Sequence, residues 1–426
     1  MMRQISLSAA FAFSLFLHHS TVLAATEWTG WLGPERNGWV EGFQPPAQWP
    51  DQLQHIWQVP VGMGYGTPLV SGDRIYQHAR QGEEEVLWCL SLKTGDTIWR
   101  TPTEVPFKMG GGGESHGKGP KSNPTLAHGR IFTMSITGVL SVFDSSTGES
   151  LWQRDFSSRF DKPHPYWGAT TSPLVDENRV MIHFGGDDEG VLVALDTETG
   201  EEVWSDGKDG ASYSSPFFGV FEGIRQIVEW NHNSLVGIEP KSGKRLWEYP
   251  FPHVGTNQNM PTPSYHQGNV IVGGENRGIR SVRPELNNGV WSVNERWNQK
   301  KLALDMSSAV INGNHLYGFS HYRLGQLFCL DTETGDIVWE GPGRSGDNAT
   351  FLSIPDHIIA LLDNGQLQVI AAGGKEFKKV ASYTVAESPT WAAPVLLENG
   401  ILIKDRDSLT YWSLNKEATA SQAPAR

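Results

Sequence analysis

Short apolar runs separated by turns fill the chain and predict an all-β protein. One pattern recurs: an apolar strand, an acidic turn ending in Thr-Gly or Ser-Gly, and a strand with Trp four residues after the Gly. Its five copies contain Gly95 and Trp99, Gly148 and Trp152, Gly200 and Trp204, Gly243 and Trp247, and Gly335 and Trp339. This spacing, with a weaker copy between the last two, indicates a repeat protein.

A second pattern marks the first half of each unit. It consists of Ser or Thr, a small residue or Pro, and two apolar runs around a short turn. Its eight copies begin near Thr67, Ser122, Thr171, Ser214, Pro261, Ser307, Thr350 and Ala392. Each copy precedes a regular or degraded acidic-turn segment, so each unit has four strands, A to D from the axis outward. The chain is therefore predicted to be an eight-bladed β-propeller of four-stranded antiparallel blades.

The two ends of the repeat region predict how the ring closes. Blade 8 runs from Trp391 to about Leu414 and lacks an outer strand, whereas an extra strand, 55–59, precedes blade 1 and resembles the Trp-bearing D strands. We expect this N-terminal strand to pair with blade 8 and close the ring. Closure removes an exposed edge that would otherwise promote aggregation.

Residues 1–24 read as a signal peptide, with Arg3, an apolar stretch over 5–17 and a small-residue cleavage site near Ala24. The apolar stretch is shorter than the ~20 residues that span a bilayer. An N-terminal segment (25–54), the propeller (55–414) and a disordered polar tail (415–426) follow. Because no second apolar span exists and no Cys directly follows the apolar stretch, we expect the mature protein to be periplasmic or secreted, without a lipid anchor. We also expect it to be a monomer.

Composition narrows the possible partners. The net charge of -13 argues against nucleic acid or an anionic membrane as a general partner. The 47 Gly, 25 Pro and 17 Trp suit many tight turns and many buried aromatic rings. Cys89 and Cys329 hold equivalent strand positions in blades 1 and 6. Since those blades are not neighbours, both cysteines are expected to be unpaired core residues.

The stretch Leu192–Trp204, with Asp-Thr-Glu-Thr-Gly before the final Trp, resembles the pyrroloquinoline-quinone-repeat (PQQ-like) propeller superfamily. The resemblance covers about residues 55–414, and residues 31–38 resemble the start of many exported members. It implies that each D-strand Trp packs between blades. The superfamily includes quinoprotein alcohol and glucose dehydrogenases and an outer-membrane-assembly lipoprotein. The chain lacks the adjacent cysteine pair of many quinoprotein alcohol dehydrogenases, a Cys-x-x-Cys-His haem motif, and the lipoprotein cysteine of the assembly factor. The resemblance therefore implies the fold but neither of these functions.

The unusual residues gather on one face of the predicted propeller. Antiparallel pairing puts the D-to-A loops and B-to-C turns at one mouth, and the short acidic C-to-D turns at the other. We expect the first mouth to bind a polar or anionic ligand through stacking and hydrogen bonds. Its candidates in D-to-A loops are His116, His164, Trp167, Asn257, Gln258, Asn259 and Trp391. Its candidates in B-to-C turns are Trp230, Asn231, His232, Glu275, Asn276, Arg277, His321, Tyr322, Arg323, Lys404, Asp405 and Arg406.

Each candidate also has a structural interpretation. The loop Gly110–Gly113 lacks the Gly-Lys-Ser/Thr of a phosphate loop. The histidines lack close ligand spacing, so no metal site is predicted. Asn231, His232 and the 275–277 turn could satisfy backbone groups between blades, and Trp167 and Trp391 could be packing residues. Asp405 could be a base or could form a structural ion pair with its basic neighbours, and the ion pair is favoured.

Three functions stay open. The first is a non-catalytic, exported binding propeller for a small ligand, a glycan or a protein partner. The second is an oxidoreductase using pyrroloquinoline quinone on alcohols or sugars. Its cofactor would contact Arg277, Arg323 and Lys404, and its Ca²⁺ would need ligands such as Glu229, Glu275 or Asn276. The third is a polysaccharide hydrolase or lyase. The missing enzyme hallmarks favour the first, and no catalytic residue is assigned.

Overall fold

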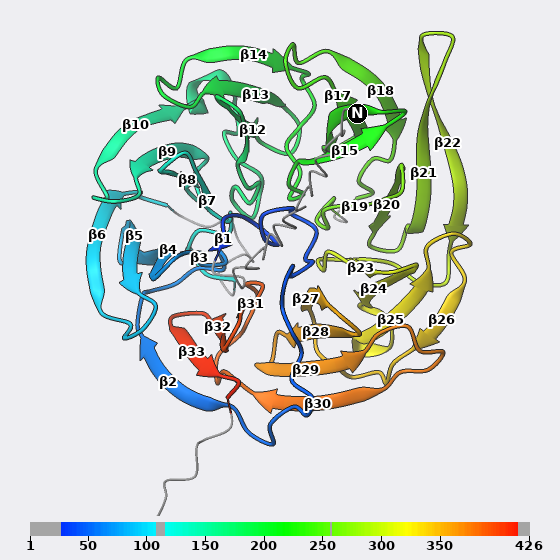
Figure 1. The fold of residues 1–426 in the computed structure, drawn as a ribbon. Helices are drawn as coiled ribbons and strands as arrows, with labels where there is room; N and C mark the ends of the chain where they lie inside the picture. Colours follow the sequence, from blue (N-terminus) through cyan, green and yellow to red (C-terminus); the bar gives the residue numbers. More distant parts are fainter. Residues whose placement is uncertain (1–26, 108–115, 256–257, 416–426) are drawn as a thin grey trace, which may run out of the picture.

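The structure, a computed structural model, describes residues 27–107, 116–255 and 258–415. Eight antiparallel sheets surround a central channel (Figure 1), which confirms the predicted all-β, eight-bladed propeller. The predicted signal peptide, almost all of the predicted tail, and Asn257 lie outside the described residues. None of the helices in the part of the chain that the structure describes is long and apolar enough to cross a membrane.

The strands of blades 1 to 4, from the axis outward, are β3 (Leu69–Ser71), β4 (Arg74–Gln81), β5 (Glu84–Ser91), β6 (Thr97–Glu104); β7 (Thr125–Ala127), β8 (Arg130–Met134), β9 (Val139–Asp144), β10 (Ser150–Asp155); β11 (Leu174–Asp176), β12 (Arg179–Gly185), β13 (Gly190–Asp196), β14 (Glu202–Asp206); β15 (Phe217–Phe221), β16 (Ile224–Trp230), β17 (Ser234–Ile238), β18 (Arg245–Pro250). The strands of blades 5 to 8 are β19 (Ser264–His266), β20 (Asn269–Gly274), β21 (Gly278–Asn287), β22 (Val290–Gln299); β23 (Val310–Asn312), β24 (His315–Ser320), β25 (Gln326–Asp331), β26 (Ile337–Glu340); β27 (Ala349–Ile354), β28 (His357–Leu362), β29 (Gln366–Ala371), β30 (Lys379–Thr384); β31 (Val395–Leu397), β32 (Gly400–Lys404), β33 (Leu409–Ser413) and β2 (Gln54–Val59). The short 3-10 helices η2 (Ser157–Arg159) and η3 (Tyr322–Leu324) lie in loops.

The ring closes as predicted. Strand β2 pairs antiparallel with β33, with Gln54 opposite Ser413 and Val59 opposite Leu409. The N-terminal strand thus becomes the outer strand of blade 8, beside the C-terminal strands in Figure 1. Cys89 and Cys329 are buried and unpaired, as expected.

The repeated Gly of one blade packs against the repeated Trp of the blade before it. Gly243 has φ +72°, and a Cβ added there would lie 2.5 Å from Cε3 of Trp204 in the preceding blade. Trp204 Nε1 donates to the carbonyl of Pro240, 3.0 Å away. The same contact joins Gly95 to Trp57 of β2. Each glycine therefore leaves room for the indole of the blade before it, and the closing strand docks as an ordinary D strand.

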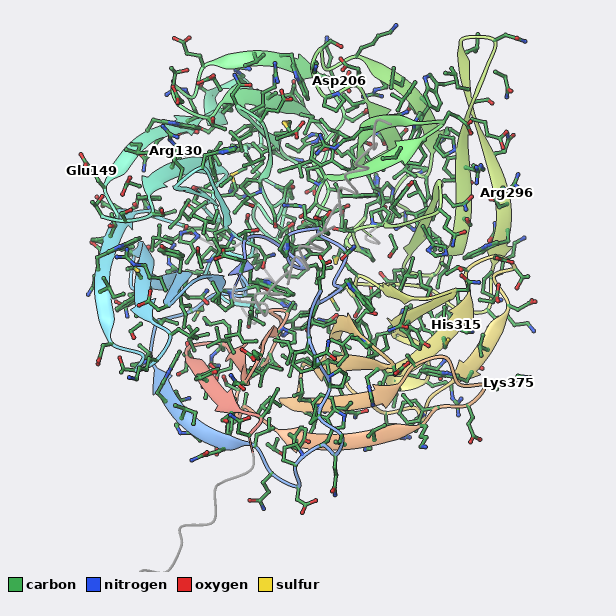
Figure 2. The ribbon with its side chains drawn as sticks, in the orientation of Figure 1. Arg130, Glu149, Asp206, Arg296, His315 and Lys375 are labelled. Atoms are coloured by element: carbon green, nitrogen blue, oxygen red, sulfur yellow. The ribbon has the colours of Figure 1, made fainter. Side chains whose placement is uncertain are left out.

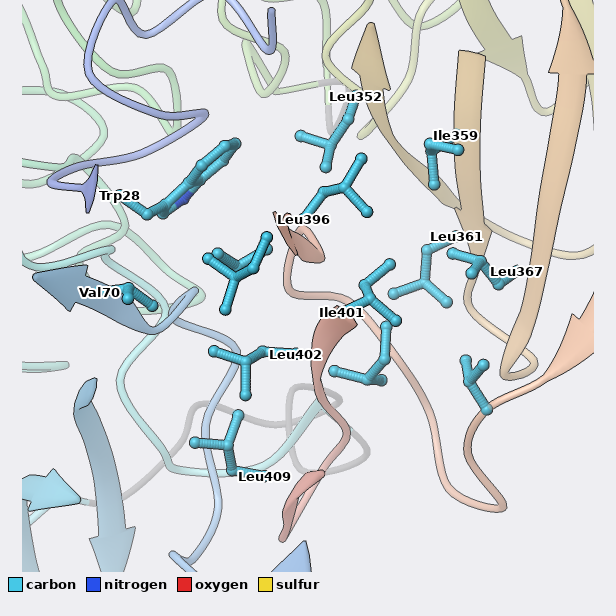
Figure 3. Close-up of a cluster of buried hydrophobic side chains, with 14 of the residues drawn as sticks. Trp28, Val70, Leu352, Ile359, Leu361, Leu367, Leu396, Ile401, Leu402 and Leu409 are labelled. Carbon is cyan, nitrogen blue, oxygen red and sulfur yellow. The ribbon is translucent and has the colours of Figure 1, made fainter. Parts of the chain in front are cut away.

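The N-terminal segment covers one end of the channel, which the residue pattern alone did not predict. Strand β1 (Glu27–Trp28) pairs with β3 and gives blade 1 a fifth strand. Farther along, the backbone of Val40 donates to the carbonyl of Ser353 in blade 7. Trp28 is buried in the apolar cluster that also contains Val70 and Leu396 (Figure 3). The segment thus crosses the channel on the acidic-turn side.

Candidate functional site

A chamber of about 260 Å³ lies in the channel, where the inner strands begin. All eight blades contribute to its wall, and Trp31 and Leu32 of the N-terminal segment contribute as well. Short polar side chains form part of the wall: Thr67, Asn123, Ser215, Thr262, Ser307 and Asn348. These residues stand at or near the Ser/Thr positions that open each repeat, so the repeat itself builds a ring of small polar groups.

Aromatic side chains form another part of the chamber wall. The His116 ring lies edge-on to Trp167 at 5.1 Å and to Trp391 at 5.3 Å between centroids. The ring of Tyr65 lies beside that of Trp391, with 6.2 Å between the ring centroids. Burial, and then the charge of Lys121, lowers the pKa of His116. The imidazole is therefore neutral at pH 7, and the wall suits stacking with a planar group.

Lys121 supplies positive charge to this chamber. Its Nζ donates to the carbonyl of Trp167 at 2.7 Å and lies 5.9 Å from the centroid of that indole. Burial lowers the pKa of Lys121 to about 8, so most of the amine is protonated at pH 7. Within the described ranges no carboxylate forms an ion pair with it. Since an ammonium group has three donors, this arrangement can bind an anion.

Three predicted site residues, His116, Trp167 and Trp391, line the chamber together. His164 does not line it; its ring contacts Phe107 at 5.3 Å, and its Nδ1 lies 2.9 Å from the carbonyl of Pro165.

The predicted residues of blades 4 and 5 form a buried network instead. Trp230 is fully buried and stacks on Phe251. Asn259 Nδ2 donates to the carbonyl of Asn231 at 2.8 Å, and Arg277 Nη1 donates to Asn259 Oδ1 at 2.7 Å. These polar atoms are thus used to hold loops together, as the structural interpretation proposed.

Arg277 extends this network to two more loop carbonyls. It donates to the carbonyl of Pro252 at 2.6 Å and to that of Gln258 at 3.2 Å. Next to it, His232 Nε2 lies 3.1 Å from His253 Nε2. Burial and the neighbouring His253 lower the pKa of His232 to about 4. The hydrogen bonds of Arg277 and the His232–His253 contact thus hold the turns of blades 4 and 5 to the loop that joins these blades.

The other predicted turns lie at the mouth but outside the chamber lining. His321 Nε2 lies 3.2 Å from Asn276 Oδ1, which joins the turns of blades 5 and 6. Asn276 also donates to Glu275 at 3.4 Å. Tyr322 and Arg323 form η3, where Arg323 has φ +57°. This second group of polar residues is half-buried or exposed and does not belong to the chamber lining.

Lys404, Asp405 and Arg406 hold blade 8 to blade 1. Lys404 is fully buried, and its Nζ donates to the carbonyls of Gly64, Asp405 and Arg406. Asp405 accepts hydrogen bonds from the backbone of its own turn rather than pairing with its basic neighbours. Arg406 pairs with Asp407 at 2.8 Å. All three donors of Lys404 are therefore occupied at the seam of the ring.

A quinone cofactor with Ca²⁺ does not fit the chamber. Ca²⁺ prefers carboxylate ligands, and none of the described lining residues carries a carboxylate. Glu229 is buried at 2.7 Å from His183 Nδ1, and Glu275 is not part of the lining. Among the described residues, no group of three His, Cys, Asp or Glu side chains is arranged to hold a metal ion.

Sequence reasoning missed Lys121, Tyr65 and Tyr213 in the chamber wall. Lys121 lies in a loop already singled out for its glycines and His116. The Ser/Thr positions at the start of each repeat were a visible signal too, but they were interpreted only as markers of strands.

Comparisons with known proteins agree with this fold. Residues 83–341, more than half of the chain, match the family model described as outer membrane protein assembly factor BamB. BamB of Shewanella oneidensis is 25% identical over 51% of this chain and 55% of its own length. BamB from Moraxella catarrhalis has a similar structure, with a TM-score of 0.61, 12% identity, and coverage of 85% of this chain and 97% of that one.

A solved quinohemoprotein alcohol dehydrogenase from Pseudomonas putida HK5 also shares the fold. Its TM-score is 0.67 at 13% identity, with coverage of 94% of this chain and 82% of the enzyme. At that identity the likeness concerns the fold alone. The family match rests on sequence and covers most of the repeats, and the chain belongs to the PQQ-like β-propeller family described as outer membrane protein assembly factor BamB.

Proposed function

We propose that this chain is an exported, non-catalytic propeller that binds a partner at its long-loop mouth during assembly of the outer membrane. The observation that carries the proposal is the family match over residues 83–341. The predicted signal peptide supports export, because assembly of the outer membrane takes place in the periplasm. The match with the Shewanella protein spans only 55% of that protein, so the role of this chain rests on the family rather than on one relative.

The chamber supports the choice of mouth and the chemistry of the ligand. Lys121 presents an ammonium group that donates to one carbonyl and lies beside the indole of Trp167. A carboxylate from a partner or a small organic anion would complete its hydrogen bonds, and a planar group would stack on Trp167 or Trp391. Trp31 and Leu32 of the N-terminal segment line the chamber, and His116, Trp167 and Trp391 of the long loops line it as well, which supports the long-loop mouth as the place of binding.

Deletion of the gene in the bacterium that encodes it tests the role. We expect lower levels of β-barrel proteins in the outer membrane and recovery when the wild-type gene is returned. Unchanged β-barrel levels, together with quinone-dependent dye reduction by the purified protein, would favour the oxidoreductase and refute the proposal.

Two lysine variants test the chamber within the same experiment. Lys121→Met removes the ammonium group and keeps most of the length of the apolar stem, so it should restore β-barrel levels poorly. Lys118→Met is the matched control, because Lys118 lies three residues earlier, is 44% exposed and pairs with Glu83. Equal recovery by both variants would show that the chamber is not the binding site. Melting temperatures of both proteins check that folding is intact.

A further inference from the structure

A second cleft, of about 410 Å³, lies between blades 1 and 2. It shares no lining residue with the chamber. Its walls come from β4, β5 and β6 on one side and from β8, β9 and β10 on the other. Because the interface between blades 1 and 2 is elsewhere filled by apolar side chains, a polar space of this size needs an explanation.

The floor of the cleft is a buried pair, His78 and Glu85. Their side chains are 6% and 1% exposed, and His78 Nε2 lies 3.2 Å from Glu85 Oε2. The other oxygen, Glu85 Oε1, accepts a hydrogen bond from the backbone of Ile136 at 2.9 Å. The second ring nitrogen of His78, Nδ1, is buried and has no hydrogen-bond partner among the described residues. A buried polar atom without a partner is costly, so this nitrogen marks a place for a ligand.

Blade 3 offers an internal comparison. His78 follows Tyr76 by two residues, and Tyr76 pairs with the first residue of β3. His183 follows Met181 by two residues, and Met181 pairs with the first residue of β11. The two histidines therefore occupy equivalent positions. Both nitrogens of His183 have partners, Glu229 at 2.7 Å and the carbonyl of Asp209 at 3.0 Å, whereas His78 faces the open cleft.

The polar groups around the cleft mostly accept hydrogen bonds. Glu104 and Asp155 are exposed carboxylates that line it. Arg80 Nη1 lies 4.0 Å from Glu85 Oε1 behind the floor, but the guanidinium donates to Gly82, Glu83 and Val105 and does not line the cleft. Glu85 Oε2 has no hydrogen-bond partner among the described residues, and when Nε2 of His78 carries the ring proton, Nδ1 is an acceptor as well. Hydroxyl groups and one amide, that of Gln153, supply the remaining polar wall; the hydroxyl groups are those of Thr103, Thr133, Ser135, Thr137 and Ser141.

We propose that this cleft binds a guanidinium or ammonium group, brought either by a small molecule such as free arginine or by a basic side chain of a partner. The cation would donate to His78 Nδ1 at the floor and to the carboxylates of Asp155 and Glu104. A guanidinium has five donors in a fixed plane and suits several acceptors at once. The site is independent of Lys121, which would bind the opposite charge.

Calorimetric titration of the purified protein tests the proposal with three probes. These are L-arginine, L-citrulline, which has nearly the same shape without the charge, and a pentapeptide with blocked ends and one central Arg. Binding of arginine or of the peptide, at least tenfold tighter than of citrulline, supports the site. Preference for the free amino acid assigns a small molecule, and preference for the peptide assigns a partner's side chain. No binding by any probe, or equal binding of citrulline, overturns the proposal.

Variants at the edge of the cleft locate the binding. The double change Glu104→Gln and Asp155→Asn removes two exposed charges and should weaken arginine binding at least tenfold. Glu149→Gln is the matched control. Glu149 is exposed and stands just before the first residue of β10, whereas Asp155 is the last residue of that strand, and Figure 2 shows Glu149 at the outer rim. It should leave binding unchanged. Full binding by the double variant, with an unchanged melting temperature, would place the cation elsewhere and refute the site.

Discussion

The contact between Gly243 and Trp204 allows the packing between blades to be measured with one methyl group. Gly243→Ala adds a Cβ 2.5 Å from Trp204 Cε3, much closer than carbon atoms approach without repulsion. The indole is 8% exposed and hydrogen-bonded to the carbonyl of Pro240, so it cannot swing aside freely. The substitution must therefore separate the two blades or displace the ring.

Two effects add up to the expected loss. Ala in the left-handed region costs about 1–2 kcal/mol. Overpacking of a well-packed contact costs about 1–3 kcal/mol more. Gly129→Ala separates these effects, because Gly129 has φ +71° and a Cβ added there meets nothing within 4 Å. The control should show the backbone cost alone, and Gly243→Ala should be about 1–3 kcal/mol less stable than the control.

Differential scanning calorimetry measures this difference. At about 2 °C per kcal/mol for a chain of this size, Gly243→Ala should melt roughly 2–6 °C below Gly129→Ala. Quenching of indole fluorescence by acrylamide should rise only in Gly243→Ala. Equal melting temperatures for the two variants would refute the view that the repeated glycine exists to receive the indole of the preceding blade.

Three further changes test the closure of the ring, the buried ion pair and the loop network. Trp57→Ala should lower stability by about 3–5 kcal/mol in calorimetry and expose β2 to proteases, whereas Ile56→Ala, at a 41% exposed position, should do neither. Burial lowers the pKa of His183, but Glu229 and Asp209 together raise it, so the net shift is upward from 6.5. Because the folded state binds the proton more tightly, this stabilisation is present below pH 6.5 and is lost as pH rises through the folded pKa; pH-dependent melting should lose that slope in Glu229→Gln. Arg277→Ala should lower the melting temperature, since three acceptors in the loop lose their donor. An unchanged melting temperature would contradict this structural role and favour a role of Arg277 in ligand binding.

The sequence by itself determined the number of blades, their four strands and the closure of the ring. It did so because these features depend on local patterns: a Gly with positive φ in five of the acidic turns, a Trp four residues after it, and a Trp-bearing strand left over before blade 1. Strand β2 pairs with β33 as the pattern predicted, and Trp57 Nε1 donates to the carbonyl of Leu92 in blade 1.

Only the tertiary structure decided which candidates share a space. Trp167 lines the chamber, whereas Trp230 is buried in the loop network and stacks on Phe251. Contacts with other parts of the chain, rather than the residue type, decide between these two positions. Lys404 resembled a ligand-binding cation in the sequence, yet three carbonyls from the seam surround it. The position of the N-terminal segment and the open side of His78 likewise depend on long-range packing that no local pattern encodes.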